Sequence, residues 1–257
     1  MQVPKTTIIP AELCNFVLTS KLIRPFQVFI YLKSKCSGKI RLSKSDMDNV
    51  ALDLGLKSGK TINSCIKKLI EINWVGFSPR SGFYFIKGFE KIRKQHKFYR
   101  RRGVEFNLDE IRDLKGFLIA TSISLLINAQ KRRKRAVERS MSGSKTPACL
   151  RSFYFEIANE ALAKILRISI STAFEWKNLA EKQGYIKIRK HFAEIDVNPK
   201  LAKEFKSQKG VPSHLIRFRT GKLWIQKSDT VVSYINFRRR AKITEFNKNT
   251  NSYYPFF

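Results

Sequence analysis

Residues 55–77, GLKSGKTINSCIKKLIEINWVGF, predict the second half of a helix-turn-helix that runs into a strand. Gly55 stands where a helix would end with a positive φ, and Ser58 can cap the next helix by accepting a hydrogen bond from a free backbone amide. Apolar residues then recur at the spacing of one buried helix face, at Ile62, Cys65, Ile66 and Leu69. We therefore expect an amphipathic helix at the centre of this stretch.

The opposite face of this helix carries cations and short hydrogen-bonding side chains. These are Lys60, Thr61, Asn63, Ser64, Lys67 and Lys68. Such a face suits insertion into a DNA groove, where cations meet phosphates and small polar groups reach base edges. An ordinary amphipathic surface helix would show the same pattern, so both interpretations stay open.

The flanking segments supply further elements of the same layout. We expect a core helix at 26–32 after Pro25, a short strand at 39–43, and a second helix from Ser43 to the glycine at 55. Aromatic strands at 74–77 and 83–86, joined by a Pro/Gly turn, predict a hairpin.

Helix, strand, helix, turn, helix and hairpin is the order of a winged helix-turn-helix, and residues 13–90 resemble that superfamily in layout. The resemblance implies that one set of residues faces the major groove or its phosphates, and that Arg80 lies on the wing. That set is Lys57, Ser58, Lys60, Thr61, Asn63, Ser64, Lys67 and Lys68.

A basic connector at 91–107, with one strand near its end, leads to a long helix at 117–136 whose far end is KRRKR. Lys131, Arg132 and Arg133 are candidates for a phosphate clamp. A nuclear address in a eukaryote or a solvated helix end would look alike. Residues 140–147 have the composition of a linker.

A second copy of the layout follows the linker. We expect a strand at 153–157, a helix capped by Asn159, a turn at 167–169, a helix ending at Gly184 and a strand at 185–188. Aligning Thr61 with Thr172 gives an offset of 172 − 61 = 111, with the second turn one residue shorter. Any two helix-turn-helix-like stretches can be aligned with one gap, which is the competing explanation.

The second copy has its own candidate DNA contacts. The outward positions of its helix are Ser169, Ser171, Thr172, Glu175 and Lys177, and its wing would carry Arg189 and Lys190. The Glu175 carboxylate would be repelled by phosphate but can accept from cytosine N4, or it points away from DNA. After a short helix at 199–208, a hairpin places Arg217 and Arg219 on one open face. An exposed sheet face made soluble by arginine would look the same.

Composition points to a polyanionic partner. The 257 residues hold 51 Lys+Arg against 20 Asp+Glu, a formal net charge of +31, and phosphate backbones favour such a surface. No apolar run reaches the ~18 residues of a membrane-spanning helix. We expect no membrane association and a cytoplasmic, nucleoid-associated location. The four cysteines are scattered, and the three histidines lie among cations, so we expect no metal, no cofactor and no enzymatic activity.

The predicted fold class is α+β, mainly α, with two winged helix-turn-helix domains in tandem and short β-hairpin wings. The domains would cover residues 1–107 and 108–257, the second with a basic C-terminal hairpin extension. Such a pair resembles replication initiators of plasmids and phages, and transcriptional regulators of mobile elements share the layout. The resemblance implies sequence-specific binding of double-stranded DNA and host replication or transcription proteins as further partners, with homodimerisation left open. The alternative is a structural or packaging protein that binds RNA or DNA mainly through phosphates.

Overall fold

The computed structural model describes residues 6–36, 38–98, 102–142, 155–195, 216–219, 222–239, 246–247 and 252–253. The fold is α+β and mainly helical, with small sheets. The chain forms two compact units, of which unit 1 comprises residues 1–122 and 235–257 and unit 2 comprises residues 123–234. This division differs from the expected boundary after residue 107, because unit 1 takes in the start of a long helix and the C-terminal segment.

Unit 1 contains an antiparallel sheet formed by strands that lie far apart in the sequence. Its strand order is β1 (Thr6–Pro10), β5 (Arg102–Asn107) and β12 (Phe237–Arg239). Phe237 pairs with Val104, and the Arg238 guanidinium lies 2.5 Å from the Glu105 carboxylate. Arg238 thus stabilises a strand pair within unit 1 as well as adding positive charge.

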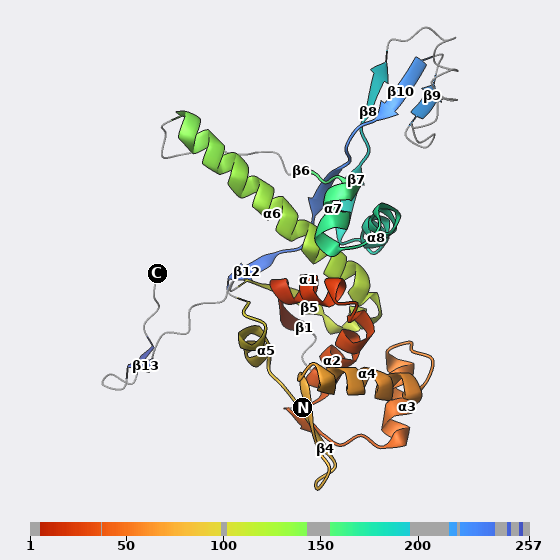
Figure 1. Cartoon of the computed structure of the whole chain (residues 1–257), viewed down its shortest axis with the longest axis vertical. Helices are drawn as coiled ribbons and strands as arrows, with labels where there is room; N and C mark the ends of the chain where they lie inside the picture. Colours follow the sequence, from red (N-terminus) through yellow and green to blue (C-terminus); the bar gives the residue numbers. More distant parts are fainter. Residues whose placement is uncertain are drawn as a thin grey trace. The chain divides into compact units, whose positions relative to one another are not determined.

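From α2 to β4 unit 1 follows the predicted order of elements, whereas part of the expected basic connector forms the helix α5, which Figure 1 labels. Its elements are α1 (Ala11–Thr19), α2 (Ile23–Lys35), β2 (Lys39–Ile40), α3 (Lys44–Asp53), α4 (Gly59–Glu71), β3 (Val75–Ser78), β4 (Phe83–Ile86), α5 (Phe89–Gln95), the 3-10 helix η1 (Leu108–Asp113) and the beginning of α6 (Leu114–Ser142). The small sheet has the order β2-β4-β3. Strand β2 is shorter than expected, because Ser43 caps α3 in a reciprocal pair of bonds with Asp46.

The core of unit 1 surrounds Trp74, which is fully buried. Its ring meets the Phe26 and Phe29 rings edge-on, at centroid distances of 5.9 and 5.6 Å. The indole N–H donates to Nε2 of His96 at 2.9 Å, and burial lowers the pKa of that imidazole. His96 is therefore part of the aromatic core, although its neighbours in sequence are cationic.

Unit 2 repeats part of this order: a strand, two helices and a strand follow a long helix, as they follow α2 in unit 1, but three further strands come before the last one. Its elements are the rest of α6, β6 (Phe155–Glu156), α7 (Asn159–Leu166), α8 (Ile170–Lys182), β7 (Ile186–Arg189), β8 (Phe192–Ile195), β9 (Ile216–Arg219), β10 (Lys222–Gln226) and β11 (Thr230–Ser233). The sheet order β6-β11-β7 matches β2-β4-β3 of unit 1, with the middle strand last in the chain. The remaining described strands, β13 (Phe246–Asn247) and β14 (Ser252–Tyr253), pair with each other and belong to the C-terminal segment of unit 1.

The segment predicted as a wing at 189–191 is part of a longer strand arrangement. Residues 189–191 form no hairpin turn, because β7 pairs with β11 and β8 pairs with β10. A bond of 2.8 Å from the Lys227 amide to the His191 carbonyl joins the two ladders into one ribbon. The predicted hairpin of β9 and β10 is present, with Trp224 opposite Arg217. The helix expected at 199–208 lies outside the described residues.

Two smaller expectations also change. Asn159 is the first residue of α7, and Ala158 holds the cap position in its place. Helix α6 continues to Ser142, into the stretch expected as a linker. Among the described ranges, none of the helices combines the length and the apolar character needed to cross a membrane.

Candidate nucleic-acid interface

The turn between α3 and α4 is held by side chains from elsewhere in unit 1. Gly55 has a φ of 66°, and the next amide, of Leu56, donates to the Ala51 carbonyl at 2.8 Å. Arg112 of η1 donates to the Asp53 and Leu52 carbonyls at 3.1 and 3.2 Å, satisfying the C-terminal end of α3. These bonds fix where α4 begins.

The start of α4 is capped by a side chain of α3 rather than by the residue at its own N-cap position. Asp48 Oδ1 accepts from the Gly59 amide at 2.9 Å. Ser58 stands at the cap position as predicted, but its side chain makes no capping hydrogen bond. A Cβ at Gly59 would lie 2.4 Å from the Asp48 carboxylate oxygen, so glycine lets the two helices approach. Asp48 thus ties the orientation of α4 to that of α3.

Helix α4 buries one face and exposes the predicted polar face. Ile62, Ile66 and Leu69 are buried in the core. The exposed positions are Lys57, Lys60, Asn63, Ser64, Lys67 and Lys68, with Ser58 and Thr61 half-buried. At the end of this face, Lys68 makes an ion pair with Glu71 at 2.7 Å. The surface therefore combines cations with amide and hydroxyl groups along the first three turns of the helix.

The predicted Arg80 is exposed at the turn of the β3–β4 hairpin, and β2 with the residue after it brings two further cations to this hairpin. Arg41 Nε donates to the Ser81 carbonyl at 3.1 Å, and its guanidinium lies 4.4 Å from the centre of the Phe83 ring. Lys39 Nζ lies 5.6 Å from the same ring. Sequence reasoning missed this pair, although the alternation of Lys39 and Arg41 in a short strand was a signal for a cationic face.

Helix α8 of unit 2 has a different surface. Ser169 caps it by accepting from the Thr172 amide at 3.1 Å. Ser169, Ser171 and Glu175 are exposed and Thr172 is half-buried. Ile170 and Phe174 are also exposed, at 53% and 41%. The face thus mixes hydroxyls, one carboxylate and apolar side chains.

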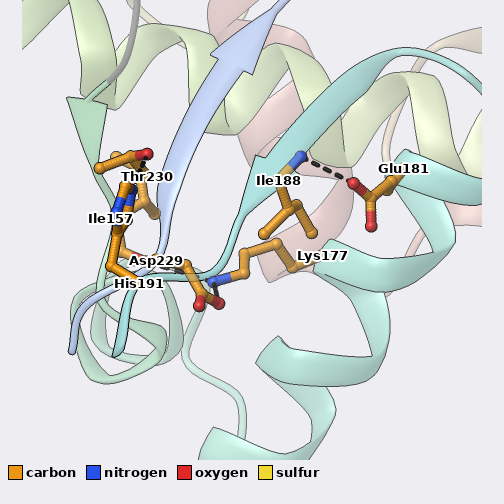
Figure 2. Close-up of polar contacts among 7 residues, drawn as sticks. All are labelled: Ile157, Lys177, Glu181, Ile188, His191, Asp229 and Thr230. Carbon is orange, nitrogen blue, oxygen red and sulfur yellow. Dashed lines mark hydrogen bonds and ion pairs between the residues drawn. The ribbon is translucent and has the colours of Figure 1, made fainter. Parts of the chain in front are cut away.

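Lys177 is a correction, because its side chain is buried at 1% exposure. Its Nζ lies 2.7 Å from Asp229 Oδ2 and donates to the Ile157 carbonyl at 3.4 Å, as Figure 2 shows. The reason lies in helix spacing: Lys177 shares a face with Ala173 and Ala180, which are also buried and whose small side chains leave room for it. The ion pair connects α8 to the residue just before β11.

The ribbon of unit 2 presents cations on its outer side. Lys187, Arg189, Lys190 and His191 are exposed. His191 Nε2 lies 2.7 Å from Thr230 Oγ1, across the ribbon, and Glu181 Oε1 accepts from the Ile188 amide at 2.7 Å (Figure 2). The sequence placed Arg189 and Lys190 at a hairpin turn, whereas Arg189 ends β7 and Lys190 lies between β7 and β8.

The remaining predicted cations lie on α6 and β9. Lys131 is half-buried, with Nζ 4.8 Å from the centre of the Phe155 ring, whereas Arg132 and Arg133 are exposed. Arg217 and Arg219 belong to β9, opposite Trp224 and Lys222, and their side chains lie outside the described part of the chain. Lys131 therefore stabilises unit 2 through its contact with Phe155.

Among the described residues, no three His, Cys, Asp or Glu side chains gather as a metal site. Burial raises the pKa of the Cys14 thiol to about 12 and raises that of Cys65. Comparisons of the chain with protein-family models, with curated proteins and with solved structures find no match. Functional proposals for this chain therefore rest on its topology, charge and surface chemistry.

Proposed function

We propose that this protein binds double-stranded DNA sequence-specifically through two winged-helix modules, as a replication initiator or transcriptional regulator of a mobile element. The observation that carries the proposal is the exposed face of α4, where Lys60, Asn63, Ser64 and Lys67 lie on the second helix of a helix-turn-helix. A helix in this position, with its apolar side in the core, is suited to enter a major groove.

The repeated turn geometry supports two modules of one kind. Helices α4 and α8 begin and end at an offset of 111, and so do β3 and β7. Asn73 and Gly184 both have positive φ at the equivalent place. Two modules in one chain can bind successive grooves, and the covalent link raises the effective concentration of the second.

Within this proposal the side chains of α4 have separate roles. Asn63 can make paired hydrogen bonds with an adenine edge, and Ser64 can bond to a neighbouring base. Lys57, Lys60 and Lys67 would neutralise phosphates, with Arg80 and Arg41 acting on the backbone beside the hairpin. In α8, Ser171 and Thr172 would make the polar contacts, and Glu175 would accept from cytosine N4.

Selection of duplexes from a random library, followed by titration, tests the proposal. We expect an enriched motif, and we expect Lys60→Ala with Asn63→Ala to weaken binding to it by roughly 10- to 100-fold while changing random-duplex binding far less. Lys91→Ala with Lys94→Ala, on the exposed side of α5, is the control, because it removes two positive charges whereas the first double variant removes one. It should lower the affinities for selected and random duplexes by the same small factor.

The alternative is a packaging protein that neutralises phosphate, for which the net charge of +31 is the supporting observation. Under that alternative the selection enriches no motif. Both double variants then weaken all duplexes alike, and each lost phosphate contact flattens the plot of log affinity against log salt by about 0.9.

A further inference from the structure

The small sheet of unit 1 has an outer face on which aromatic and cationic side chains alternate. Strand register places Lys39 and Gly76 on either side of Phe85, and places Ser78 opposite Phe83. Phe83 and Phe85 are two residues apart on β4 and so point to the same side of the sheet. The Lys39 and Arg41 cations lie by the Phe83 ring, which brings both to this face.

Phe85 is the open ring of this group. It is 47% exposed, although it lies on the central strand of the sheet. Its neighbour on β3 is Gly76, which has no side chain to cover the ring; a Cβ there would lie 3.7 Å from the Phe85 Cβ, an ordinary contact. Glycine inside a strand weakens it, and close approach of a ligand is one reason for its presence.

Charge distinguishes this face from a chance exposed ring. Single exposed aromatic residues are common on protein surfaces. Here the positions Lys39, Arg41, Gly76, Ser78, Phe83 and Phe85 hold two cations and no carboxylate. Arg41 is also held in place by its bond to the Ser81 carbonyl. Figure 1 shows the hairpin that carries β4 projecting beyond helices α3 and α4 of the same unit.

We propose that Lys39, Arg41, Phe83 and Phe85, here called the stacking face, bind single-stranded DNA. An unpaired base stacks on the Phe85 ring, and the flanking phosphates are neutralised by Lys39 and Arg41, since cations interleaved with open aromatic rings match the alternation of phosphate and base. A paired base in a duplex offers no free ring surface to Phe85. The stacking face is therefore specific for unpaired strands, whereas the polar face of α4 suits duplexes. Only the choice of DNA over RNA rests on the proposed function.

Fluorescence anisotropy with labelled oligo-dT, oligo-U of the same length and a random duplex tests this proposal on the full chain. Phe85→Ala should weaken oligo-dT binding by about 5- to 150-fold, while Phe85→Trp, which keeps a stacking ring, should retain it. Gly76→Val should also weaken oligo-dT binding, because its side chain would cover the ring. Neither change should alter duplex affinity more than about twofold. Lys60→Ala with Asn63→Ala, which should weaken binding to a selected duplex, should leave oligo-dT affinity within about twofold of the wild type.

Equal losses on oligo-dT and duplex, or no loss on oligo-dT, would overturn the stacking face. Tighter binding of oligo-U than of oligo-dT, lost in Phe85→Ala, would overturn the choice of DNA in favour of single-stranded RNA. The two proposals fail separately. If duplex selection enriches no motif while oligo-dT binding still depends on Phe85, the stacking face stands and sequence-specific duplex recognition does not.

Discussion

Gly55 and Arg167 hold the same place in the two units, each just after the first of two helices joined by a short turn, with φ of 66° and 54°. The amide that follows closes the same bond in both: Leu56 to the Ala51 carbonyl at 2.8 Å, and Ile168 to the Ala163 carbonyl at 3.1 Å. Glycine adopts this conformation without strain, whereas arginine does not. The two turns therefore have the same geometry, but the backbone conformation is strained at Arg167 and unstrained at Gly55.

Substitutions at this turn should act with opposite signs in the two units. Gly55→Ala should lower the free energy of unfolding by about 1 kcal/mol, because alanine strains the left-handed conformation. Arg167→Gly should raise it by less than about 1 kcal/mol, since glycine also gains freedom in the unfolded chain. Urea denaturation measures both. Effects of the same sign would show that the two turns differ in conformation.

The buried ion pair of unit 2 should be costly to break from one side. Lys177→Met leaves the Asp229 carboxylate buried, and we expect a loss of about 3–5 kcal/mol in the free energy of unfolding. Lys177→Met with Asp229→Leu should cost less than the sum of the two single changes, because no buried charge remains. The control is Lys68→Ala with Glu71→Ala on the surface of α4, worth about 1 kcal/mol or less. Additive losses at Lys177 and Asp229 would contradict the pairing.

The bond between Trp74 and His96 should make unit 1 sensitive to acid. The indole N–H donates to Nε2, so the bond requires a neutral imidazole, and burial holds the pKa of His96 below its ordinary value of 6.5. A histidine whose folded pKa is lowered contributes its full stability above its unfolded pKa. That contribution falls as the pH drops from about 6.5 towards the folded pKa.

Urea denaturation of the wild type and of His96→Gln across this range tests the effect. Glutamine can accept from the indole but does not titrate, so stability of the variant should fall less between pH about 7 and pH about 5. His191 and His214 are present in both proteins and cancel in the comparison. Parallel curves would show that His96 has the same pKa in the folded and unfolded states.

Local patterns in the sequence predicted the two helices around Gly55 well, because the features that determine them lie within one short segment. The apolar spacing of Ile62 and Leu69 and the positive φ expected at Gly55 are confirmed. The capping of α4 by Asp48 could not be predicted from local patterns, because this hydrogen bond joins two helices across a turn. Lys177 was misplaced for a related reason: its spacing from Ala173 and Ala180 indicated burial, but only the fold supplies the carboxylate that permits it.

Long-range strand pairing was the least predictable part. Strand β12 completes a sheet with β5 from more than a hundred residues away, and no local turn signal marks that pairing. The ribbon of unit 2 likewise depends on β10 and β11 returning to β8 and β7. The stacking face had a partial signal in the alternating Lys39 and Arg41, but Phe85 and Gly76 become neighbours only through strand register.

Asp48 should couple the stability of the helix-turn-helix to DNA recognition. Asp48→Ala removes the acceptor for the Gly59 amide, so α4 loses its cap and this hydrogen bond to α3. We expect a loss of about 1 kcal/mol in the free energy of unfolding, together with weaker binding to a selected duplex, because the start of α4 is no longer fixed.

Asp46→Ala is the matched control. It removes a cap and one negative charge from the same helix, but its carboxylate bonds only within α3 and its cap, to Ser43. Stability should fall in both variants and selected-duplex affinity only in Asp48→Ala, as measured by urea denaturation and anisotropy. Equal affinity losses would mean that the orientation of α4 does not depend on Asp48.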